Sequence, residues 1–242
     1  VRTVPPSGCV VANGLEESLA RVLHQGCWSS MSSFGAVVSD FSAQGEPGAF
    51  DVLHHGQSVA RVEWALTGVH NQLNALAAIA AAHHVGVPPA EAAAALGRFQ
   101  NVRRRMEVRG TVRGITVYDD FAHHPTAIRT TLDGLRRSVG KDARILAVFE
   151  PRSNTMKLGT MKAQLPWALE GTDLAFCHTA GLDWDAAAAL APVGARAQTA
   201  STIDQIVQQV ALAAMPGDHI VCMSNGSFGG VHARLLQALT AP

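Results

Sequence analysis

Nine residues in the middle of the chain, Tyr118–Thr126, read YDDFAHHPT and lie between two segments of different pattern. Before them, residues 114–118 read GITVY, a run of β-branched and aromatic residues that begins at a glycine and is typical of a strand. After them, Pro125 suits the first turn of a helix, and the apolar residues of 128–135 recur at helical spacing. The stretch therefore predicts a strand, a polar turn and an amphipathic helix.

The predicted turn carries two carboxylates, Asp119 and Asp120, and two imidazoles, His123 and His124. Backbone N–H groups at the start of a helix are unpaired and favour negative charge. The turn is therefore suited to hold a phosphate or a ribose. The alternative is that Asp119 or Asp120 caps the helix and that the histidines are solvated, and the local spacing leaves both interpretations open.

The chain beyond this turn alternates strands and helices. Buried strands are expected at 143–149, 173–179 and 219–223. A helix is expected over 202–214, with Ser201 and Asp204 forming its capping box. This order predicts an α/β domain with an open, Rossmann-like, mostly parallel sheet and helices on both faces. Ligands of such sheets bind beyond the carboxyl ends of the strands.

Two polar loops follow the first and last of these strands. Residues 150–157 read EPRSNTMK, and residues 224–230 read SNGSFGG. The glycines let the backbone approach a ligand closely, although turn chemistry alone also explains them. Arg152 and Lys157 are suited to hold carboxylates. The second loop is not Gly-x-Gly-x-x-Gly, so the sequence does not favour a nicotinamide or flavin site.

The first half of the chain has a different pattern. Strands are expected at 36–38, 50–53 and 58–64. The turn at 54–57 joins the last two in a hairpin, which predicts an antiparallel unit. We expect His54 and His55 to be exposed in this turn rather than to bind a metal, because no other ligand-type residues neighbour them in the sequence.

Two helices are expected after these strands, over 68–82 and 89–96. The first carries His70, Asn71 and Asn74 in its opening turns. Asn71 and Asn74 lie three positions apart on one face, and an amide can both donate and accept hydrogen bonds, as recognition of an adenine edge requires. The alternative is that one asparagine caps the helix and the other packs against it.

Three consecutive arginines, Arg103–Arg105, follow the helices. They lie between the two predicted helices and the strands that follow, so a guanidinium there could reach a nucleotide phosphate. The alternative is that the three arginines only form a solvated face. We place the domain boundary near residue 106, which gives domains of 1–106 and 107–242.

The bulk composition limits the possible partners. Nineteen basic and nineteen acidic residues balance among 242, so no net charge attracts nucleic acid or an anionic membrane. The four cysteines are far apart and favour free thiols in a reducing compartment. No signal peptide or long apolar run is recognisable, and we expect a cytoplasmic protein. The first residue is Val1, which suggests a fragment or a processed chain.

Three motifs together resemble one family. Residues 68–75 (GVHNQLNA), 103–107 (RRRME) and 119–126 (DDFAHHPT) occur in the order found in the Mur ligases, which are ATP-dependent amide-forming enzymes of peptidoglycan metabolism. The resemblance is clearest from residue 26 to the end. It implies that 1–106 is the later part of a central ATP-binding domain, with antiparallel strands and helices, and that 107–242 is the carboxy-terminal, acceptor-peptide-binding domain.

The resemblance also implies roles for individual residues. Asn74 would contact adenine with His70 and Asn71 beside it, Arg105 would approach the phosphates, Asp120 would hold the ribose, and His123 would lie near the phosphates. Asp120 and His123 are thereby the candidate catalytic residues. The acceptor pocket would be lined by Arg152, Ser153, Asn154, Lys157, Ser224, Asn225 and Gly226.

Within the family, the stretches at 118–128, 150–157 and 224–230 most resemble a ligase that joins UDP-N-acetylmuramate to the recycled tripeptide L-alanyl-γ-D-glutamyl-meso-diaminopimelate. ATP would activate the muramyl carboxylate as an acyl phosphate, and Mg²⁺ would neutralise the phosphoryl charge. One alternative is the ligase that adds L-alanine to the same nucleotide, which shares the pattern of residues 119–126. Another is a non-catalytic module that only binds the acceptor.

The chain departs from the family pattern at one point. Nothing in it matches the glycine-rich loop ending in Gly-Lys-Ser/Thr that cradles ATP phosphates. The magnesium ligands would also lie upstream of Val1. We therefore expect a fragment that does not catalyse ligation alone, and turnover by the purified chain above a matched blank would contradict this.

Overall fold

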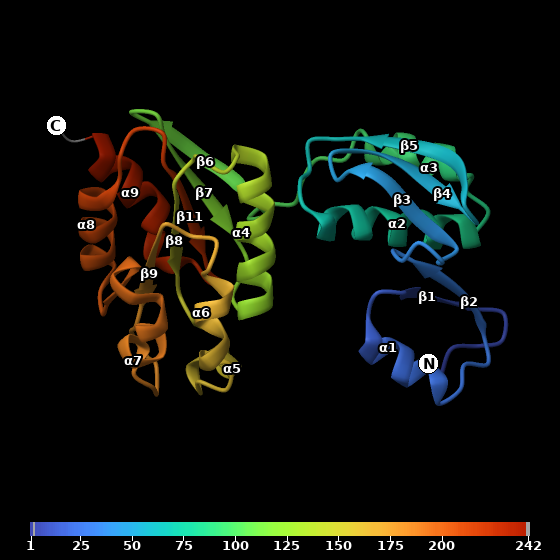
Figure 1. Ribbon diagram of the computed structural model, residues 1–242, viewed down its shortest axis with the longest axis horizontal. Coiled ribbons are helices and arrows are strands. Elements are labelled where there is room, and N and C mark those ends of the chain that lie inside the picture. Colours follow the sequence, from blue (N-terminus) through green and yellow to red (C-terminus); the bar gives the residue numbers. More distant parts are fainter. Residues whose placement is uncertain (2, 241–242) are drawn as a thin grey trace. The chain divides into compact units, whose positions relative to one another are not determined.

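The structure is a computed structural model that describes residue 1 and residues 3–240. The chain forms two compact units, Val1–Asn101 and Val102–Pro242, whereas the sequence interpretation placed the boundary near residue 106. Each unit has its own sheet (Figure 1). The first unit has one hydrophobic cluster of buried residues, and the second has one on each face of its sheet.

The first unit contains a five-stranded sheet in the order β1-β2-β3-β4-β5. Its strands are β1 (Cys9–Asn13), β2 (Ser30–Phe34), β3 (Phe41–Glu46), β4 (Ala49–His54) and β5 (Gln57–Glu63). Its helices are α1 (Glu17–His24), α2 (Val69–His84) and α3 (Pro89–Leu96). β3, β4 and β5 pair antiparallel, which confirms the predicted hairpin, and β1 pairs parallel to β2.

The core of the first unit lies between its sheet and α2. Phe50, Val52 and Val62 of the strands are fully buried together with Leu76 and Ile79 of the helix. The burial of alternate strand residues and of helical residues three apart follows from the two periodicities of the sequence. The cluster accounts for the hydrophobic pattern that predicted these elements.

The strand predicted at Ala36–Val38 is wrong. These residues form the connection between β2 and β3, and Val37 and Val38 are 92% and 95% exposed. Gly35 takes a φ of +99°, which ends the extended backbone of β2. The Asp40 carboxylate then accepts a hydrogen bond from the backbone N–H of Ser33, 2.7 Å away, and so closes a turn. Three apolar residues in a row were too short a run to indicate a strand.

The second unit contains a six-stranded sheet in the order β10-β9-β8-β11-β7-β6. Its strands are β6 (Glu107–Val112), β7 (Ile115–Asp120), β8 (Ile145–Phe149), β9 (Leu174–His178), β10 (Ala197–Ala200) and β11 (His219–Met223). All neighbours pair parallel except β6, which pairs antiparallel to β7. The predicted α/β class and mostly parallel sheet are confirmed.

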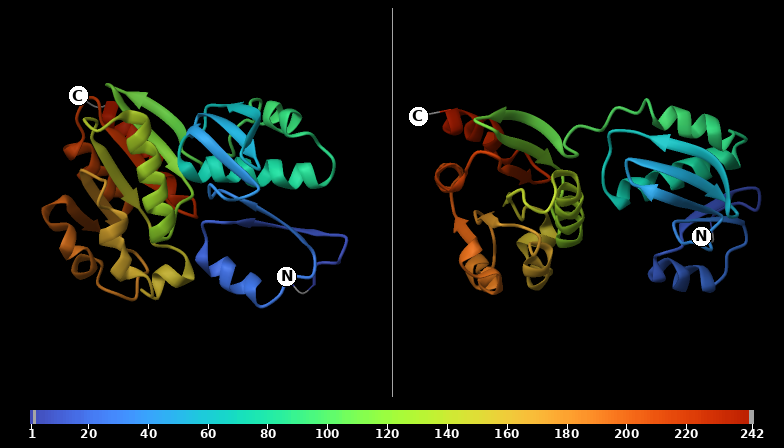
Figure 2. Two further views of the ribbon diagram at one scale, coloured as in Figure 1. Left: turned by 45° about the vertical axis from the view of Figure 1, so that its right-hand side comes forward. Right: turned by 45° about the horizontal axis from the view of Figure 1, so that its top comes forward.

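Helices cover both faces of this sheet (Figure 2). They are α4 (Pro125–Val139), α5 (Asn154–Lys157), α6 (Leu165–Ala168), α7 (Ala186–Leu190), α8 (Ile203–Ala213) and α9 (Val231–Thr240). Ile145, Ala147 and Phe149 of β8 belong to the core under α4 to α7, whereas Leu146 and Val148 belong to the core under α8 and α9. A strand buried on both faces requires the continuous apolar run that the sequence shows.

The predicted capping box of α8 is wrong by one residue. Thr202, not Ser201, caps the helix, because its side-chain oxygen accepts a hydrogen bond from the backbone N–H of Gln205, 3.2 Å away. Ser201 instead donates from its backbone N–H to the Gln205 side chain. Thr202 and Gln205 have the same spacing as the pair we predicted, so the residue types fit and only the position differs.

The four cysteines are free thiols. Cys177 and Cys222 are buried, and burial raises the pKa of both thiols, whereas Cys9 and Cys27 are half-buried.

Within residues 1 and 3–240, no helix is both long and apolar enough to cross a membrane.

The chain reverses direction across the sheet beside β11 in the second unit. β8 and β11 are neighbours, and the chain leaves β8 toward α5 on one face but leaves β11 toward α9 on the other. In open parallel sheets, ligands bind at such a reversal, outside the carboxyl ends of the strands. The loops at 150–153 and 224–230 begin at this edge.

Candidate functional site

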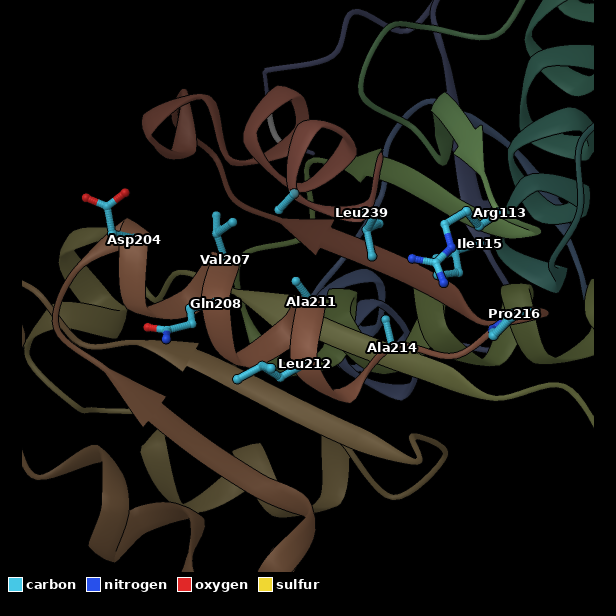
Figure 3. Close-up of a pocket in the computed structure, with 11 residues that line it drawn as sticks. Arg113, Ile115, Asp204, Val207, Gln208, Ala211, Leu212, Ala214, Pro216 and Leu239 are labelled. Atoms are coloured by element: carbon cyan, nitrogen blue, oxygen red, sulfur yellow. The ribbon is translucent and has the colours of Figure 1, made fainter. Parts of the chain in front are cut away.

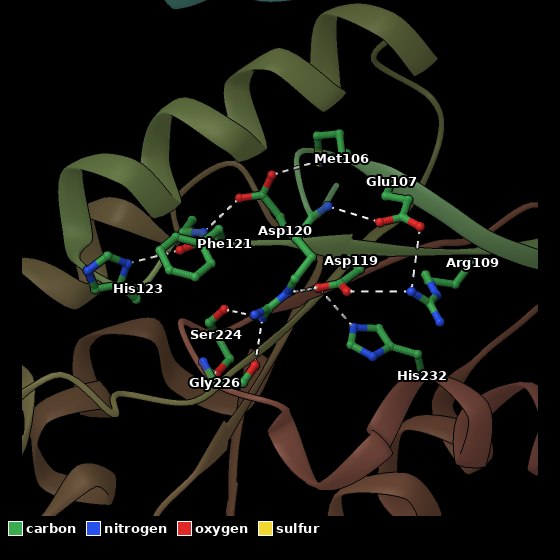
Figure 4. Close-up of polar contacts among 12 residues, drawn as sticks. Met106, Glu107, Arg109, Asp119, Asp120, Phe121, His123, Ser224, Gly226 and His232 are labelled. Carbon is green, nitrogen blue, oxygen red and sulfur yellow. Dashed lines mark hydrogen bonds and ion pairs between the residues drawn. The ribbon is translucent and has the colours of Figure 1, made fainter. Parts of the chain in front are cut away.

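Asp120 is the last residue of β7 and is only 3% exposed. Its Oδ1 accepts hydrogen bonds from the N–H of Ala122 at 2.8 Å and from the Thr131 hydroxyl at 3.0 Å. Its Oδ2 accepts a third from the N–H of Met106 at 2.9 Å (Figure 4). A carboxylate has about four acceptor positions, so most of this one is already used to hold the turn.

The helix after the turn is capped by a histidine and not by either aspartate. The Nδ1 of His124 accepts a hydrogen bond from the N–H of Ala127 at 3.5 Å, and Pro125 opens α4. The capping alternative for Asp119 and Asp120 is therefore wrong. Asp120 instead accepts from the backbone of Ala122, two residues further on, and of Met106, just before β6, which leaves the helix start to His124.

Phe121 brings two further candidate residues together. His123 packs edge-on against its ring with 5.5 Å between ring centroids, and its Nδ1 lies 2.9 Å from the Phe121 carbonyl oxygen. The Arg105 guanidinium lies over the same ring, 5.6 Å from the centroid. Asp120, His123 and Arg105 thus belong to one local cluster, in which a cation–π contact helps to hold the arginine.

Asp119 lies in a buried ionic cluster on the other side of the strand end. It is 4% exposed. Its Oδ1 lies 3.3 Å from Arg104 Nε and 3.3 Å from His232 Nε2, and its Oδ2 lies 3.9 Å from Arg109 Nη1. A buried carboxylate requires such partners. Asp119 is therefore a structural anchor for the end of β7 (Figure 4).

The loops after β8 and β11 are joined by a short hydrogen-bonded chain. The Ser224 hydroxyl donates to Glu150 Oε2 at 2.7 Å and accepts from the N–H of Gly226 at 2.9 Å. The other Glu150 oxygen lies 3.6 Å from Nδ1 of His178, the last residue of β9. Ser224 is only 1% exposed, so its side chain serves the loop rather than the surface.

The remaining predicted acceptor residues belong to the same two chain segments, and Arg152 contacts the turn. The exposed Arg152 lies against Gly226, where an added Cβ would meet its Cζ at 2.7 Å and its Cδ at 2.8 Å. Asn225 is half-buried, and its Oδ1 has no hydrogen-bond partner among the described residues. Ser153 caps the short helix α5, which begins at Asn154 and ends at Lys157. All seven predicted acceptor residues therefore lie on the loops after β8 and β11 or on α5, which follows the first of these loops.

The predicted adenine-binding residues lie in the first unit, on the first turns of α2. Asn71 donates from its side-chain amide to the carbonyl oxygen of Thr67 at 2.7 Å. Asn74 is exposed, and His70 is half-buried. The Asn74 side chain is thus exposed, whereas the Asn71 amide is hydrogen-bonded to the residue that precedes the helix N-cap.

Several residues of the edge were not predicted. Arg104 donates to the carbonyl oxygens of Ser224 and Gly226, and Glu150 and His178 meet beside the same turn. Both Glu150 and His178 stand at the ends of predicted strands, so the rule that ligands bind at carboxyl ends offered a signal for them. Nothing in the sequence distinguished Arg104 from its two neighbours, or marked His232 within α9.

A cavity of about 520 Å³ lies away from this edge (Figure 3). Its lining includes Val207 and Leu212 of α8, Leu239 of α9, Ile115 and Pro216. Ile115 is the first residue of β7, and Pro216 precedes β11, so the cavity lies at the amino ends of the parallel strands. It is therefore not part of the candidate site.

Three histidines of the second unit have a pKa below the ordinary value, which predicts that its stability depends on pH. Burial is the largest cause that lowers the pKa of His124, His219 and His232. For His232, Asp119 opposes this effect, whereas Arg109 adds to it. A histidine with a lowered pKa in the folded state binds protons more readily when unfolded, so its stabilising contribution is present above about pH 6.5 and is lost at lower pH.

We therefore expect the free energy of unfolding to fall as the pH is lowered from 7.5 to about 5.5, because the unfolded histidines bind protons in this range. Urea unfolding at several pH values measures this. His232→Gln, which does not titrate, should reduce the slope. A stability that is constant over the range, or a slope unaffected by this variant, would contradict the expectation.

Comparison with known proteins agrees with this architecture. A family model described as "Mur ligase, glutamate ligase domain" matches residues 104–226. A UDP-N-acetylmuramate–L-alanyl-γ-D-glutamyl-meso-2,6-diaminoheptandioate ligase of Haemophilus influenzae is 46% identical over 242 residues, which cover 99% of this chain and 53% of the relative. A UDP-N-acetylmuramate–L-alanine ligase of Mycobacterium sp. (strain JLS) is 31% identical over 248 residues, covering 98% and 50%.

A solved structure gives the same result. The crystal structure of a murein peptide ligase from Psychrobacter arcticus matches with a TM-score of 0.78 and 38% identity, covering 100% of this chain and 53% of that one. The chain spans about half the length of the relatives it matches. Since the family model covers half of the chain and includes the edge described above, this chain belongs to the Mur ligase family.

Proposed function

We propose that the chain is part of an ATP-dependent ligase that joins UDP-N-acetylmuramate to the tripeptide L-alanyl-γ-D-glutamyl-meso-diaminopimelate in peptidoglycan recycling. One observation carries the proposal: Arg152 is exposed beside the Ser224–Gly226 turn, at the edge of the sheet where ligands bind. A peptide with several carboxylates needs cationic and amide contacts of this kind. The similarity to relatives named for this substrate supports the choice.

The reaction would proceed by two displacements. The muramyl carboxylate attacks the γ-phosphorus of ATP, which forms an acyl phosphate and releases ADP. The free amine of the peptide then attacks the acyl carbon, loses a proton, and displaces inorganic phosphate to leave an amide bond. In this proposal the second unit binds the peptide and keeps its amine oriented for the attack.

We assign the nucleotide contacts to the two other groups of residues. Asn74 on α2, with His70 and Asn71 beside it, would contact adenine. Arg105 and His123, which both lie against Phe121, would contact phosphates. Asp120 would contact the ribose through the acceptor position that its three hydrogen bonds leave. Because the reaction consumes ATP, we place it in the cytoplasm.

Magnesium is the metal that this chemistry implies. Among residues 1 and 3–240, no group of three or more histidine, cysteine, aspartate or glutamate side chains could hold a metal ion. The buried carboxylates of Asp119 and Asp120 are already occupied by arginine and by N–H and O–H donors. The described residues therefore do not fit a magnesium site.

Calorimetric titration of the chain with the tripeptide, and with L-alanine in parallel, tests the proposal. We expect saturable binding of the tripeptide and none of L-alanine. Arg152→Ala should weaken tripeptide binding by about tenfold to a hundredfold, the worth of hydrogen bonds to a charged group. Arg137→Ala, which removes an exposed arginine of α4, is the matched control and should bind normally.

The alternatives make different predictions in the same experiment. Binding of L-alanine instead of the tripeptide would assign the chain to the alanine-adding ligases, to which it is also similar. Tripeptide binding that is equal in the native chain and in Arg152→Ala would remove the loop after β8 from the acceptor site. A module that only binds the acceptor would show the expected binding but no ligation when joined to the part of the relatives that this chain does not span.

A further inference from the structure

Arg104 connects the loops at the ends of β7 and β11. Its Nη2 donates to the carbonyl oxygens of Ser224 at 2.6 Å and of Gly226 at 2.7 Å. Its Nε lies 3.3 Å from Asp119 Oδ1, and its guanidinium lies over the Phe121 ring, 5.2 Å from the centroid. Only a planar group with several N–H donors can make these contacts at the same time.

The backbone around Arg104 holds its side chain in this direction. Arg104 has a φ of +61°, which is uncommon for a residue other than glycine. Its N–H donates to Glu107 Oε2 at 2.9 Å, and the N–H of Met106 donates to Asp120 Oδ2 at 2.9 Å. The Arg104 side chain is 28% exposed, so its ionic contact with the buried Asp119 is partly shielded from water.

Glu150, the residue directly after β8, also holds the Ser224–Gly226 turn. It accepts from the Ser224 hydroxyl, which in turn accepts from the N–H of Gly226. The carbonyl oxygens of Ser224 and Gly226 thus accept from Arg104. The Ser224 hydroxyl accepts from the N–H of Gly226 and donates to Glu150, so it links the turn to that carboxylate. The Arg152 guanidinium then rests on Gly226, where there is no room for a Cβ. The position of Arg152 therefore depends on a turn that these two charged side chains fix.

We propose that Arg104 is a positioning residue for the acceptor peptide. It touches no substrate in this role. It holds the carbonyl groups of Ser224 and Gly226, and the turn so fixed sets the place of Arg152, the cation that we assign to an acceptor carboxylate. The inference rests on the proposed function, since it takes the tripeptide as the ligand of this edge.

Hydrogen exchange and calorimetry on the same variants test the proposal. The variants are Arg104→Ala, Arg104→Lys and the control Arg137→Ala. In Arg104→Ala we expect the Gly226 N–H to exchange about tenfold faster or more, and the dissociation constant of the tripeptide to rise by a similar factor, because two charge-assisted hydrogen bonds are lost. Amides of β8 and β9 should exchange as in the native chain, which separates a local effect from general destabilisation.

The conservative variant keeps the test decisive. Arg104→Lys retains the charge beside Asp119, so the unit should fold normally, but one ammonium cannot reach both carbonyl oxygens in the same geometry. We expect it to recover only part of the lost binding. Gly226 exchange and tripeptide binding that are unchanged in both Arg104 variants would overturn the proposal.

The outcomes also separate this inference from the proposed function. Faster Gly226 exchange in Arg104→Ala, in a chain that binds no tripeptide at all, would refute the tripeptide as ligand, and with it the role in acceptor binding, while the contact of Arg104 with the turn would stand. Normal tripeptide binding by the native chain with unchanged binding in Arg104→Ala would refute only the positioning role.

Discussion

Replacement of Asp120 by alanine is expected to lower the free energy of unfolding of the second unit by about 3–5 kcal/mol, because each buried donor left without a partner costs about 1–3 kcal/mol. The variant leaves two such donors, the N–H of Ala122 and the hydroxyl of Thr131, and a half-buried one, the N–H of Met106. Asp120 is 3% exposed, so water does not readily replace the carboxylate. Native-state hydrogen exchange of the β8 and β11 amides measures the opening of this unit.

Two further variants sharpen this prediction. Asp120→Asn keeps one acceptor oxygen but turns an NH2 group toward a donor, so it should lose less stability than alanine while still falling below the native chain. Asp142→Ala removes an exposed carboxylate from the same unit and should be nearly neutral. If Asp120→Ala were as stable as Asp142→Ala, the turn would not depend on these hydrogen bonds.

The strands that the sequence predicted best are those buried on both faces. Residues 145–149 and 220–223, within the predicted ranges 143–149 and 219–223, are apolar throughout because helices cover both sides of β8 and β11. The edge strands β6 and β10 were not predicted, since one side of each has no strand partner and their sequences, EVRGTV and AQTA, carry polar residues. Hydrophobic pattern is a good guide to the centre of a sheet and a poor one to its edges.

The site was predictable residue by residue but not as an arrangement. The motif at 118–126 and the loops at 150–157 and 224–230 were found because their composition is unusual for strand ends. Their proximity depends on β11 lying between β7 and β8, an insertion that the order of elements in the chain does not reveal. Arg104 was missed for the same reason, since its partners Ser224 and Gly226 lie 120 and 122 positions away.

The structure also gives two of the predicted site residues a structural role. Ser224 was expected to line the acceptor pocket, but its hydroxyl is engaged with Glu150 and Gly226. Asp120 was expected to hold a ribose, and most of its acceptor capacity holds the backbone. Both assignments stay predictions, and in each case a variant would alter the local structure as well as any ligand contact. Tests of the acceptor site are therefore better made at Arg152 and Gly226.

Gly226→Ala is expected to weaken tripeptide binding by about tenfold to a hundredfold while leaving the fold nearly unchanged, because it displaces a charged hydrogen-bonding group without removing one. The new methyl group would collide with the Arg152 guanidinium. The colliding atoms, from Cδ to the guanidinium, belong to a flexible and exposed side chain, and Gly226 is not among the glycines with a positive φ, so the backbone tolerates alanine. Thermal unfolding should therefore stay close to that of the native chain.

A matched control and a double variant make the cause of this loss identifiable. Gly171→Ala adds a methyl group whose nearest neighbour would be Asp133 Oδ1 at 3.8 Å, an ordinary contact far along the chain from the loop, and it should bind the tripeptide normally. If Gly226→Ala acts only by moving Arg152, it should have no further effect in an Arg152→Ala background, since two changes that remove the same contact are not additive. Fully additive losses in calorimetric titration would mean that the turn itself, rather than the guanidinium resting on it, contacts the acceptor.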